Sequence, residues 1–384
     1  MSRGALIYTD SLFGPSETFV GGLIALVAQQ EPGLSVVTHR VCDQRAAPAE
    51  VTELPKYFPR GTARWLVSAA ARRFLGVELF EWALRRHMIR HRFAVAHAQF
   101  GQPGYFMWRA LEAAGAPKPR LIVNFYGYDA TGLLVDAPEW RGRYRALFAY
   151  KELAVVVEGP VMKSRLAALG CPEEKIHEVP LCLDLGAPDL EPRPRAPRSG
   201  DGPVFGMVGR MVEKKGFAFA LRHLAPVLRA HPNASIVVVG DGPRRVEIEA
   251  LIASLSLGRQ VRLKGMLPYT DLLEEVRGLD ALLVPSLTAA NGDSEGGAPT
   301  IVAEAQILGT PVIASDHADI PFSLADHSYM FKEGDDRALA ETVTRFVRDR
   351  GATYDAARAR VWTLERHDRR ALGARYAALY RGAP

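Results

Sequence analysis

The chain has 384 residues, of which 48% are hydrophobic and 24% charged, so it can build the cores of two ordinary domains. Its formal net charge of +5 suits an anionic ligand or a membrane surface but is too diffuse to indicate a protein that binds nucleic acid. Cys42, Cys171 and Cys182 form no C-x-x-C pair and no metal-ligand spacing, which favours a reduced, cytoplasmic setting.

The first apolar run, Ala5 to Tyr8, predicts a buried strand, and it is too short for the core of a signal peptide. No later segment has the roughly 18 apolar residues that a membrane-spanning helix needs, so we expect a soluble or peripheral protein. The loop from Thr9 to Pro15 leaves the carboxyl end of this strand, and Ser16 is a good N-cap for the next helix. The loop can line a ligand cleft, or it can simply precede a capped helix.

The segment from Lys56 to Arg92 is basic, with nine Lys or Arg residues among aromatic and aliphatic side chains. It predicts an amphipathic hairpin of two helices. Such a hairpin can lie on anionic lipid or meet an anionic acceptor, because its apolar side chains insert while its cations meet phosphates. It can equally be a solvated helical face over an ordinary core.

The rest of the first half continues the alternation of strands and helices that is typical of a βαβ sheet. After the strand Ser35 to Val41, the strands are predicted at Ala94 to Pro103, Leu121 to Asp129, Leu153 to Val157 and Ile176 to Pro180. Glu158-Gly-Pro opens a helix that ends near Gly170. The proline-rich stretch from Gly186 to Pro203 can form neither a helix nor a central strand, so we place a domain boundary there.

The second half predicts another doubly wound sheet. Its strands are Val204 to Val208, Ser235 to Val239, Val261 to Leu263, Ala281 to Val284, Thr310 to Ala314 and Tyr329 to Phe331. Val239-Gly-Asp-Gly-Pro243 lacks the third glycine of a dinucleotide-binding fingerprint, so we reject that interpretation. From about Ala338 to Tyr380 the pattern is helical throughout.

Two stretches of this half carry chemistry. After the strand Ala281 to Val284 comes a polar loop, and Pro299 suits the first position of a helix that Gly309 stops. The N–H groups of Gly296, Gly297 and Ala298 would lie at the positive end of that helix and form an anion site. Glu295 on the loop and Glu304 in the helix could face one ligand, or both could be ordinary solvated glutamates. The other stretch, Val204 to Phe217, places Arg210 and Lys215 on one loop after a strand, where they are either ligands for an anion or surface cations.

Three motifs occur together: Gly209-Arg-x-x-x-x-Lys-Gly216, Glu295-Gly-Gly-Ala-Pro299 and Glu304-Ala305. This combination resembles the donor site of retaining GT-B fold glycosyltransferases of the large family 4, or group 1. The resemblance is greatest to exopolysaccharide glycosyltransferases of the colanic acid and amylovoran type, which are also similar at Ser16-Glu-Thr-Phe19. It covers most of the chain, is strong from about Val204 to Pro321, and is weak from about Ala46 to Arg92.

The resemblance implies an α/β GT-B fold, with two Rossmann-like doubly wound domains facing across a cleft. The acceptor-binding domain would span 1–185 with a returning helix at about 368–384, a linker would span 186–203, and the nucleotide-sugar domain 204–367. The protein would move a sugar from a UDP- or GDP-sugar to a glycan or lipid-linked acceptor, with retention of configuration. The chain has no Asp-x-Asp triplet, so no metal or other cofactor is expected.

The resemblance also implies roles for residues. Arg210 and Lys215 would stabilise the leaving diphosphate, Glu304 would accept hydrogen bonds from ribose hydroxyls, and Glu295 would hold the sugar. The catalytic set would be Glu295, Arg210, Lys215 and His97, although His97 can also be a satisfied core histidine. The donor would contact Gly209, Arg210, Lys215, Gly265, Met266, Glu295, Gly296, Gly297, Ala298, Pro299, Thr300 and Glu304. The acceptor side would hold Ser16, Glu17, Tyr126 and Asp129.

The sequence departs from the family pattern in two places. Tyr126 stands where the family usually has histidine, and eight residues separate Glu295 from Glu304 where the family usually has seven. Two other functions remain open at this point. A nucleotide-sugar epimerase on the same fold would convert the donor without an acceptor, and a non-catalytic sugar-binding scaffold would tolerate loss of Arg210 and Lys215.

Overall fold

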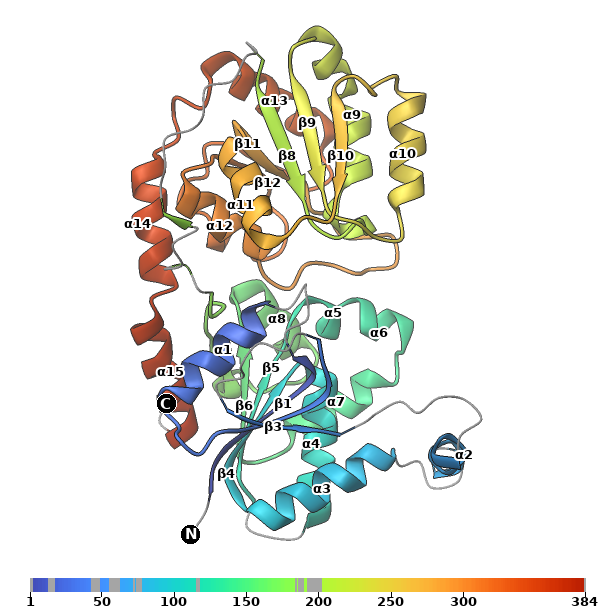
Figure 1. Cartoon of the computed structure of the whole chain (residues 1–384), viewed down its shortest axis with the longest axis vertical. Coiled ribbons are helices and arrows are strands. Elements are labelled where there is room, and N and C mark those ends of the chain that lie inside the picture. The colour runs from blue at the N-terminus through green and yellow to red at the C-terminus, as the bar shows by residue number, and fades with distance from the viewer. Residues whose placement is uncertain are drawn as a thin grey trace. The chain divides into compact units, whose positions relative to one another are not determined.

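The structure is a computed structural model that describes residues 3–12, 18–42, 49–54, 63–71, 73, 78–114, 118–183, 185, 190–191 and 202–382. The chain divides into two compact units (Figure 1). The first unit comprises Met1–Asp184 with His367–Pro384, and the second comprises Leu185–Arg366. Each is a parallel sheet covered by helices, as the alternation of apolar runs and helical patterns predicts.

The first unit contains a seven-stranded sheet in the order β3-β2-β1-β4-β5-β6-β7, with every described pair parallel. The strands are β1 (Arg3–Leu12), β2 (Ser35–Val41), β3 (Glu50–Glu53), β4 (Phe93–Gln99), β5 (Arg120–Asn124), β6 (Leu153–Val157) and β7 (Ile176–Glu178). The predicted strands are confirmed, and β3 is an addition. Its sequence, Glu-Val-Thr-Glu, is polar because it is a short edge strand.

The helices of the first unit are α1 (Thr18–Ala28), α2 (Ala63–Ala70), α3 (Leu79–His91), α4 (Gly101–Ala114), α5 (Gly127–Ala130), α6 (Gly132–Asp136), α7 (Trp140–Phe148), α8 (Pro160–Ala168), the 3-10 helix Glu173–Lys175 and α15 (Arg369–Arg381). They bury two apolar clusters. In one of these, Leu372, Tyr376 and Leu379 of α15 pack with Val20 and Ile24 of α1. The last helix of the chain is thus part of the first unit's core, and Figure 1 shows it beside α1.

The predicted basic segment contains two helices, α2 and α3, and Lys56 and Arg72 lie outside the described residues. The packing of these helices as a hairpin stays a prediction. The helix α3 packs on α4 and buries Phe80, Leu84 and Met88. Among the described residues, no helix is long and apolar enough to cross a membrane.

The second unit contains a six-stranded parallel sheet in the order β10-β9-β8-β11-β12-β13. The strands are β8 (Val204–Val208), β9 (Ser235–Val239), β10 (Val261–Gly265), β11 (Ala281–Val284), β12 (Val312–Ser315) and β13 (Met330–Phe331). The helices are the 3-10 helices Glu213–Lys215 and Pro321–Ser323 with α9 (Phe217–Ala230), α10 (Arg245–Ser254), α11 (Tyr269–Gly278), α12 (Thr300–Leu308), α13 (Asp336–Asp349) and α14 (Ala356–Arg366). The second doubly wound sheet is confirmed.

The segment from Ala338 to Tyr380, predicted to be helical throughout, forms three helices with breaks between them. Arg350 and Gly351 have φ angles of 57° and 73°, so the first helix ends in two left-handed residues. The third helix starts afresh after Asp368, whose carboxylate accepts the N–H of Ala371. Gly351 was an available sequence signal for the first break, since glycine commonly follows the end of a helix.

Candidate active site

The strand order places two loops side by side in the second unit. The chain runs outward from β8 through β9 to β10, then returns to β11 on the other side of β8, so the loops after β8 and β11 leave neighbouring strands at the carboxyl edge. Gly216, with a φ of +68°, closes the first loop, and a Cβ there would lie 1.8 Å from the carbonyl oxygen of Pro285 in the second. Only glycine permits this close approach.

Two consecutive lysines of the first loop hold the second loop. Lys215 Nζ lies 2.7 Å from Glu295 Oε1, while Lys214 Nζ donates to Asp293 Oδ1 and to the carbonyl oxygen of Ser294, each at 3.1 Å. The Ser286 hydroxyl also donates to Glu295 Oε1, at 3.1 Å. The structure thus brings Lys215 and Glu295, singled out from separate stretches of sequence, into one ion pair.

Glu295 is buried, with 7% of its surface exposed. Burial by itself would raise the pKa of its carboxyl group, but the charges of Lys215 and Lys214 outweigh burial, so the pKa is lowered. Glu295 is therefore an ionised, paired carboxylate rather than a solvated one.

Arg210 lies on the same loop as Lys215 and is exposed. Within the part of the chain that the structure describes, its guanidinium takes part in no hydrogen bond or ion pair. It follows Gly209, whose φ of +146° is open to glycine but strained for other residues. Arg210 is thus a cation available to an anionic ligand.

The backbone after Glu295 offers donors to the same kind of ligand. Gly296 and Gly297 are buried and Ala298 is half-buried, and among the described residues their N–H groups donate to no acceptor. The helix α12 follows, ending at Gly309 (φ +77°) as predicted. Pro299, however, is the N-cap of α12 with a ψ of 138°, and the helix starts at Thr300, so the prediction of Pro299 as its first residue is wrong by one position. Unsatisfied N–H groups before a helix start form an anion-binding arrangement.

Glu304 lies inside α12 and is 6% exposed, so it too is not a solvated glutamate. The Tyr269 hydroxyl donates to its Oε1 at 2.9 Å. Burial raises the pKa of this carboxyl group to about 7, with the Tyr269 hydrogen bond opposing that rise. The two glutamates therefore differ: Glu295 is held ionised by lysines, and Glu304 is poised between its two protonation states.

Three glycines bring the loops after β8, β9 and β10 together. The Gly209 N–H donates to the Val239 carbonyl at 3.0 Å, and the Gly240 N–H donates to the Gly265 carbonyl at 2.8 Å. A Cβ on Gly240 would lie 2.0 Å from the Gly209 oxygen. The glycines of the rejected dinucleotide motif thus serve loop packing, while the predicted donor residue Met266 is 63% exposed beside Gly265.

Sequence reasoning missed two residues behind Glu295. His317 follows β12 and is 1% exposed; its Nε2 accepts the Glu295 N–H at 3.2 Å, and its Nδ1 lies 2.8 Å from Glu333 Oε2. Glu333 follows β13 and also accepts the Thr288 N–H. The available signal was their position, since each is a polar residue directly after a strand at the same edge as the two loops.

The predicted site residues of the first unit are mostly engaged in its core. Ser16 and Glu17 lie outside the described residues. Asp129 is 2% exposed and accepts the N–H groups of Gly101 and Tyr126 at 3.0 and 3.2 Å. The carboxylate therefore fastens the loop after β5 to the start of α4.

His97 is fully buried, and its Nδ1 and Nε2 lie 2.9 Å from Tyr380 Oη and Asn124 Oδ1. Burial lowers the pKa of His97 to about 4, so the ring is neutral at pH 7. This is the geometry of a satisfied core histidine, the alternative that the sequence left open. Its hydrogen bonds tie α15 to the strands β4 and β5.

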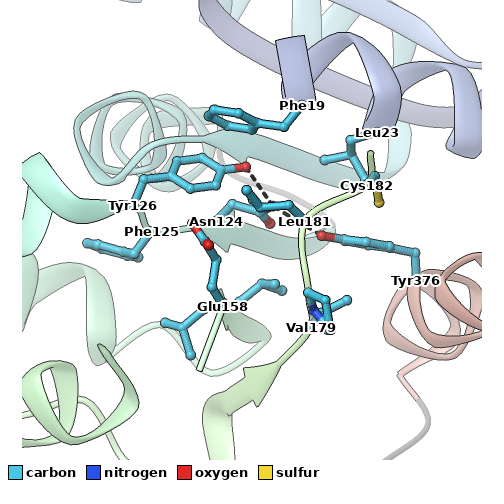
Figure 2. A pocket seen from close by; sticks show the side chains of 13 residues that line it. Phe19, Leu23, Asn124, Phe125, Tyr126, Glu158, Val179, Leu181, Cys182 and Tyr376 are labelled. Atoms are coloured by element: carbon cyan, nitrogen blue, oxygen red, sulfur yellow. Dashed lines mark hydrogen bonds between the residues drawn. The ribbon is translucent and has the colours of Figure 1, made fainter. Parts of the chain in front are cut away.

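Tyr126 is 8% exposed and forms part of the wall of a small cavity in the first unit (Figure 2). Its hydroxyl donates to Gln99 Oε1 at 2.8 Å and accepts from Asn124 Nδ2 at 3.1 Å, while its ring packs on Phe19. The cavity has a volume of about 10 Å³, which is room for one water molecule. It is too small for a sugar.

The sequence has relatives among known proteins. Residues 191–361 match the family described as glycosyl transferases group 1. The chain is 31% identical over 253 residues to the amylovoran biosynthesis glycosyltransferase AmsK of Erwinia amylovora, covering 63% of this chain and 59% of that protein. It is 29% identical over 252 residues to the putative colanic acid biosynthesis glycosyltransferase WcaL of Escherichia coli K12, covering 65% and 60%. The match thus spans about 60% of the length of these relatives.

Solved structures share the fold. The Anabaena protein Alr3699/HepE in complex with UDP and glucose has a TM-score of 0.74 at 14% identity, covering 98% of this chain and 99% of that chain. Sucrose-phosphate synthase from Thermosynechococcus elongatus has a TM-score of 0.71 at 17% identity, covering 99% and 98%. These neighbours are GT-B glycosyltransferases, so the predicted α/β GT-B fold class is confirmed.

Proposed function

We propose that the protein transfers a sugar from a nucleotide-diphosphate sugar to a glycan or lipid-linked acceptor, because residues 191–361 match the family of group 1 glycosyl transferases. The acceptor would belong to the synthesis of a cell-surface or exported polysaccharide. The names of the amylovoran and colanic acid relatives support this choice of acceptor.

One observation carries the proposal. At the carboxyl edge of the second sheet, exposed Arg210 lies on the same loop as Lys215, which pairs with Glu295, and the N–H groups of Gly296 and Gly297 follow that carboxylate. Cations and unsatisfied N–H groups at a helix start bind a diphosphate. The neighbouring ionised carboxylate binds hydroxyl groups, so this edge suits a sugar joined to a diphosphate.

The chemistry follows from these groups. When the bond between the sugar and the diphosphate breaks, negative charge develops on the leaving phosphate. The planar guanidinium of Arg210 would stabilise that charge through paired hydrogen bonds, and Lys215 would stabilise it as a compact cation. The N–H groups before α12 would add their fixed dipoles. Lys215 already neutralises Glu295, so it can serve the phosphate while still orienting the carboxylate that holds the sugar.

Glu304 would receive the ribose hydroxyls, with Met266 and the backbone near Gly265 beside the base. A UDP-sugar or a GDP-sugar is proposed as donor, and solved neighbours of this fold are named for complexes with UDP. We further propose retention of the anomeric configuration and independence of a metal ion. Arg210 and Lys215 support the latter, since they supply the positive charge that a divalent ion would otherwise bring.

A screen of nucleotide sugars by thermal shift, followed by calorimetry with the matching nucleoside diphosphate, tests the donor site. We expect one nucleotide sugar to stabilise the protein. Lys215→Ala and Arg210→Ala should each weaken nucleoside diphosphate binding by about 1.5–3 kcal/mol, the usual range for a charge-assisted hydrogen bond. The exposed variant Lys332→Ala, on a different loop, is the control.

If both Arg210→Ala and Lys215→Ala kept the native affinity for the nucleoside diphosphate, this loop would not be the phosphate site. Conversion of the donor to its epimer without any acceptor would instead indicate an epimerase on the same fold.

A further inference from the structure

A buried histidine, His317, contacts the Glu295 segment, and Glu333 contacts that histidine. The loops that carry them follow β12 and β13, the strands beyond β11 in the sheet order, so three adjacent carboxyl ends supply the Glu295 segment, His317 and Glu333. Ser294 Oγ and the Glu295 N–H lie 3.0 and 3.2 Å from His317 Nε2. Neither His317 nor Glu333 belongs to the predicted donor contacts.

The hydrogen bonds assign the tautomer of His317. Since Nε2 faces the backbone N–H of Glu295, it must present its lone pair, and the ring proton must therefore lie on Nδ1. There it donates to Glu333 Oε2 at 2.8 Å. Glu333 also accepts the Thr288 N–H through Oε1, and both hydrogen bonds favour its ionised form.

The same pair therefore holds the loop after β11 at two points. Glu333 fixes the loop near its start, at Thr288, and His317 fixes it at the Ser294–Glu295 peptide. This peptide determines where the Glu295 carboxylate and the N–H groups of Gly296 and Gly297 point. A side chain held by one ion pair alone would be less well oriented.

We propose that His317, supported by Glu333, is a positioning residue that orients the Glu295 segment toward the sugar of the donor. The proposal rests on the proposed function and adds the residues on which sugar recognition depends.

Two substitutions test the two ring nitrogens of His317 one at a time. In His317→Asn the amide occupies the place of Nδ1, so it can reach Glu333 but offers nothing to Glu295. In His317→Gln the amide reaches the place of Nε2 and can still accept the Glu295 N–H. The affinities of each variant for UDP-glucose, UDP-galactose and GDP-mannose, divided by those for UDP or GDP, report on the sugar alone.

We expect His317→Asn to lower this affinity ratio by about tenfold or more, the cost of leaving a buried hydrogen bond unmade, while His317→Gln stays within about threefold of the native protein. His327→Gln, in which an exposed histidine of the same unit is replaced, is the matched control.

Equal ratios in His317→Asn and the native protein would overturn the proposal. A second readout needs no ligand. Nitrogen-15 spectra of the native protein should show His317 protonated at Nδ1, and the Glu295 amide should exchange faster in His317→Asn. A proton on Nε2, or an unchanged exchange rate, would contradict the assignment. If no nucleotide or nucleotide sugar binds the native protein, the proposed function fails, and these two measurements still decide whether His317 holds the segment.

Discussion

At the scale of single residues, Glu295 and Glu304 show how two glutamates of one unit come to differ in pKa. Glu295 is ionised because two lysines from a neighbouring loop outweigh the effect of burial. Glu304 has one tyrosine hydroxyl as partner, and burial raises its pKa to about 7. The two carboxylates thus respond differently to pH.

The raised pKa of Glu304 has a consequence for stability. The folded protein holds this proton up to about pH 7, whereas the unfolded chain releases it near pH 4.5. Between these values the folded state binds more protons, so the stability of the second unit falls as pH rises and then levels off. The difference in pKa corresponds to about 3 kcal/mol above pH 7.

Glu304→Gln should remove this cost, because the amide keeps an acceptor for Tyr269 but carries no charge. We expect the variant to unfold at higher denaturant than the native protein at pH 8, by up to about 3 kcal/mol, and to match it near pH 4.5. Its affinity for the nucleoside diphosphate should nevertheless fall. Exposed Glu365→Gln is the control, and a Glu304→Gln protein no more stable at pH 8 would contradict the prediction.

Sequence reasoning found these glutamates but not the contacts that they make. The signals used were residue type, glycine-rich turns and helix ends, and all of these are local in sequence. They were therefore enough to single out Glu295, Glu304, Arg210 and Lys215. The Lys215–Glu295 pair and the His317–Glu333 pair each join loops from different strands. No local pattern indicates which loops become neighbours until the strand order is known.

At the scale of secondary-structure elements, every described strand except the edge strand β3 was predicted. Leu153–Val157 and Val204–Val208 were predicted to the residue because strands buried on both faces are continuous apolar runs. The edge strand β3 has no such run. The break at Arg350 is set by left-handed backbone conformation, and the neighbouring Gly351 was its available sequence signal.

The helix α3 presents a mixed apolar and basic face. Trp82, Arg86, Ile89 and Arg90 are exposed at helical spacing, and the Arg86 guanidinium lies 5.6 Å from the centre of the Trp82 ring. On the opposite face, Leu84 and Met88 are buried in the core. One face of the helix therefore packs on the core, and binding of anionic lipid by the exposed face stays a prediction.

This face predicts binding to vesicles that contain phosphatidylglycerol at low salt, and release as salt rises, because each surface cation contributes about 1 kcal/mol that salt screens. Arg73→Ser, Arg86→Ser and Arg90→Ser combined should abolish co-sedimentation and leave nucleotide affinity unchanged. Replacing three exposed arginines elsewhere, Arg337, Arg358 and Arg370, is the control. If the native protein did not co-sediment with these vesicles at low salt, α3 would be a solvated helix that does not bind lipid.

At the scale of the whole molecule, we propose that the transfer needs no divalent ion. We expect transfer to persist in excess EDTA, and the new linkage to keep the anomeric configuration of the donor. Product formation in EDTA and proton NMR of the product measure the two. Loss of activity that magnesium restores would contradict the first expectation, and an inverted linkage the second.

The incorporation of α15 into the first unit has a consequence for how the chain can fold. The second unit, Leu185–Arg366, is one uninterrupted stretch of chain, whereas the first unit needs segments from both sides of it. During synthesis the second unit can therefore complete its sheet before the first unit receives Tyr376 and Tyr380. A gene fragment can encode the second unit alone, but any fragment that encodes the first must join Asp184 to His367 across a designed link.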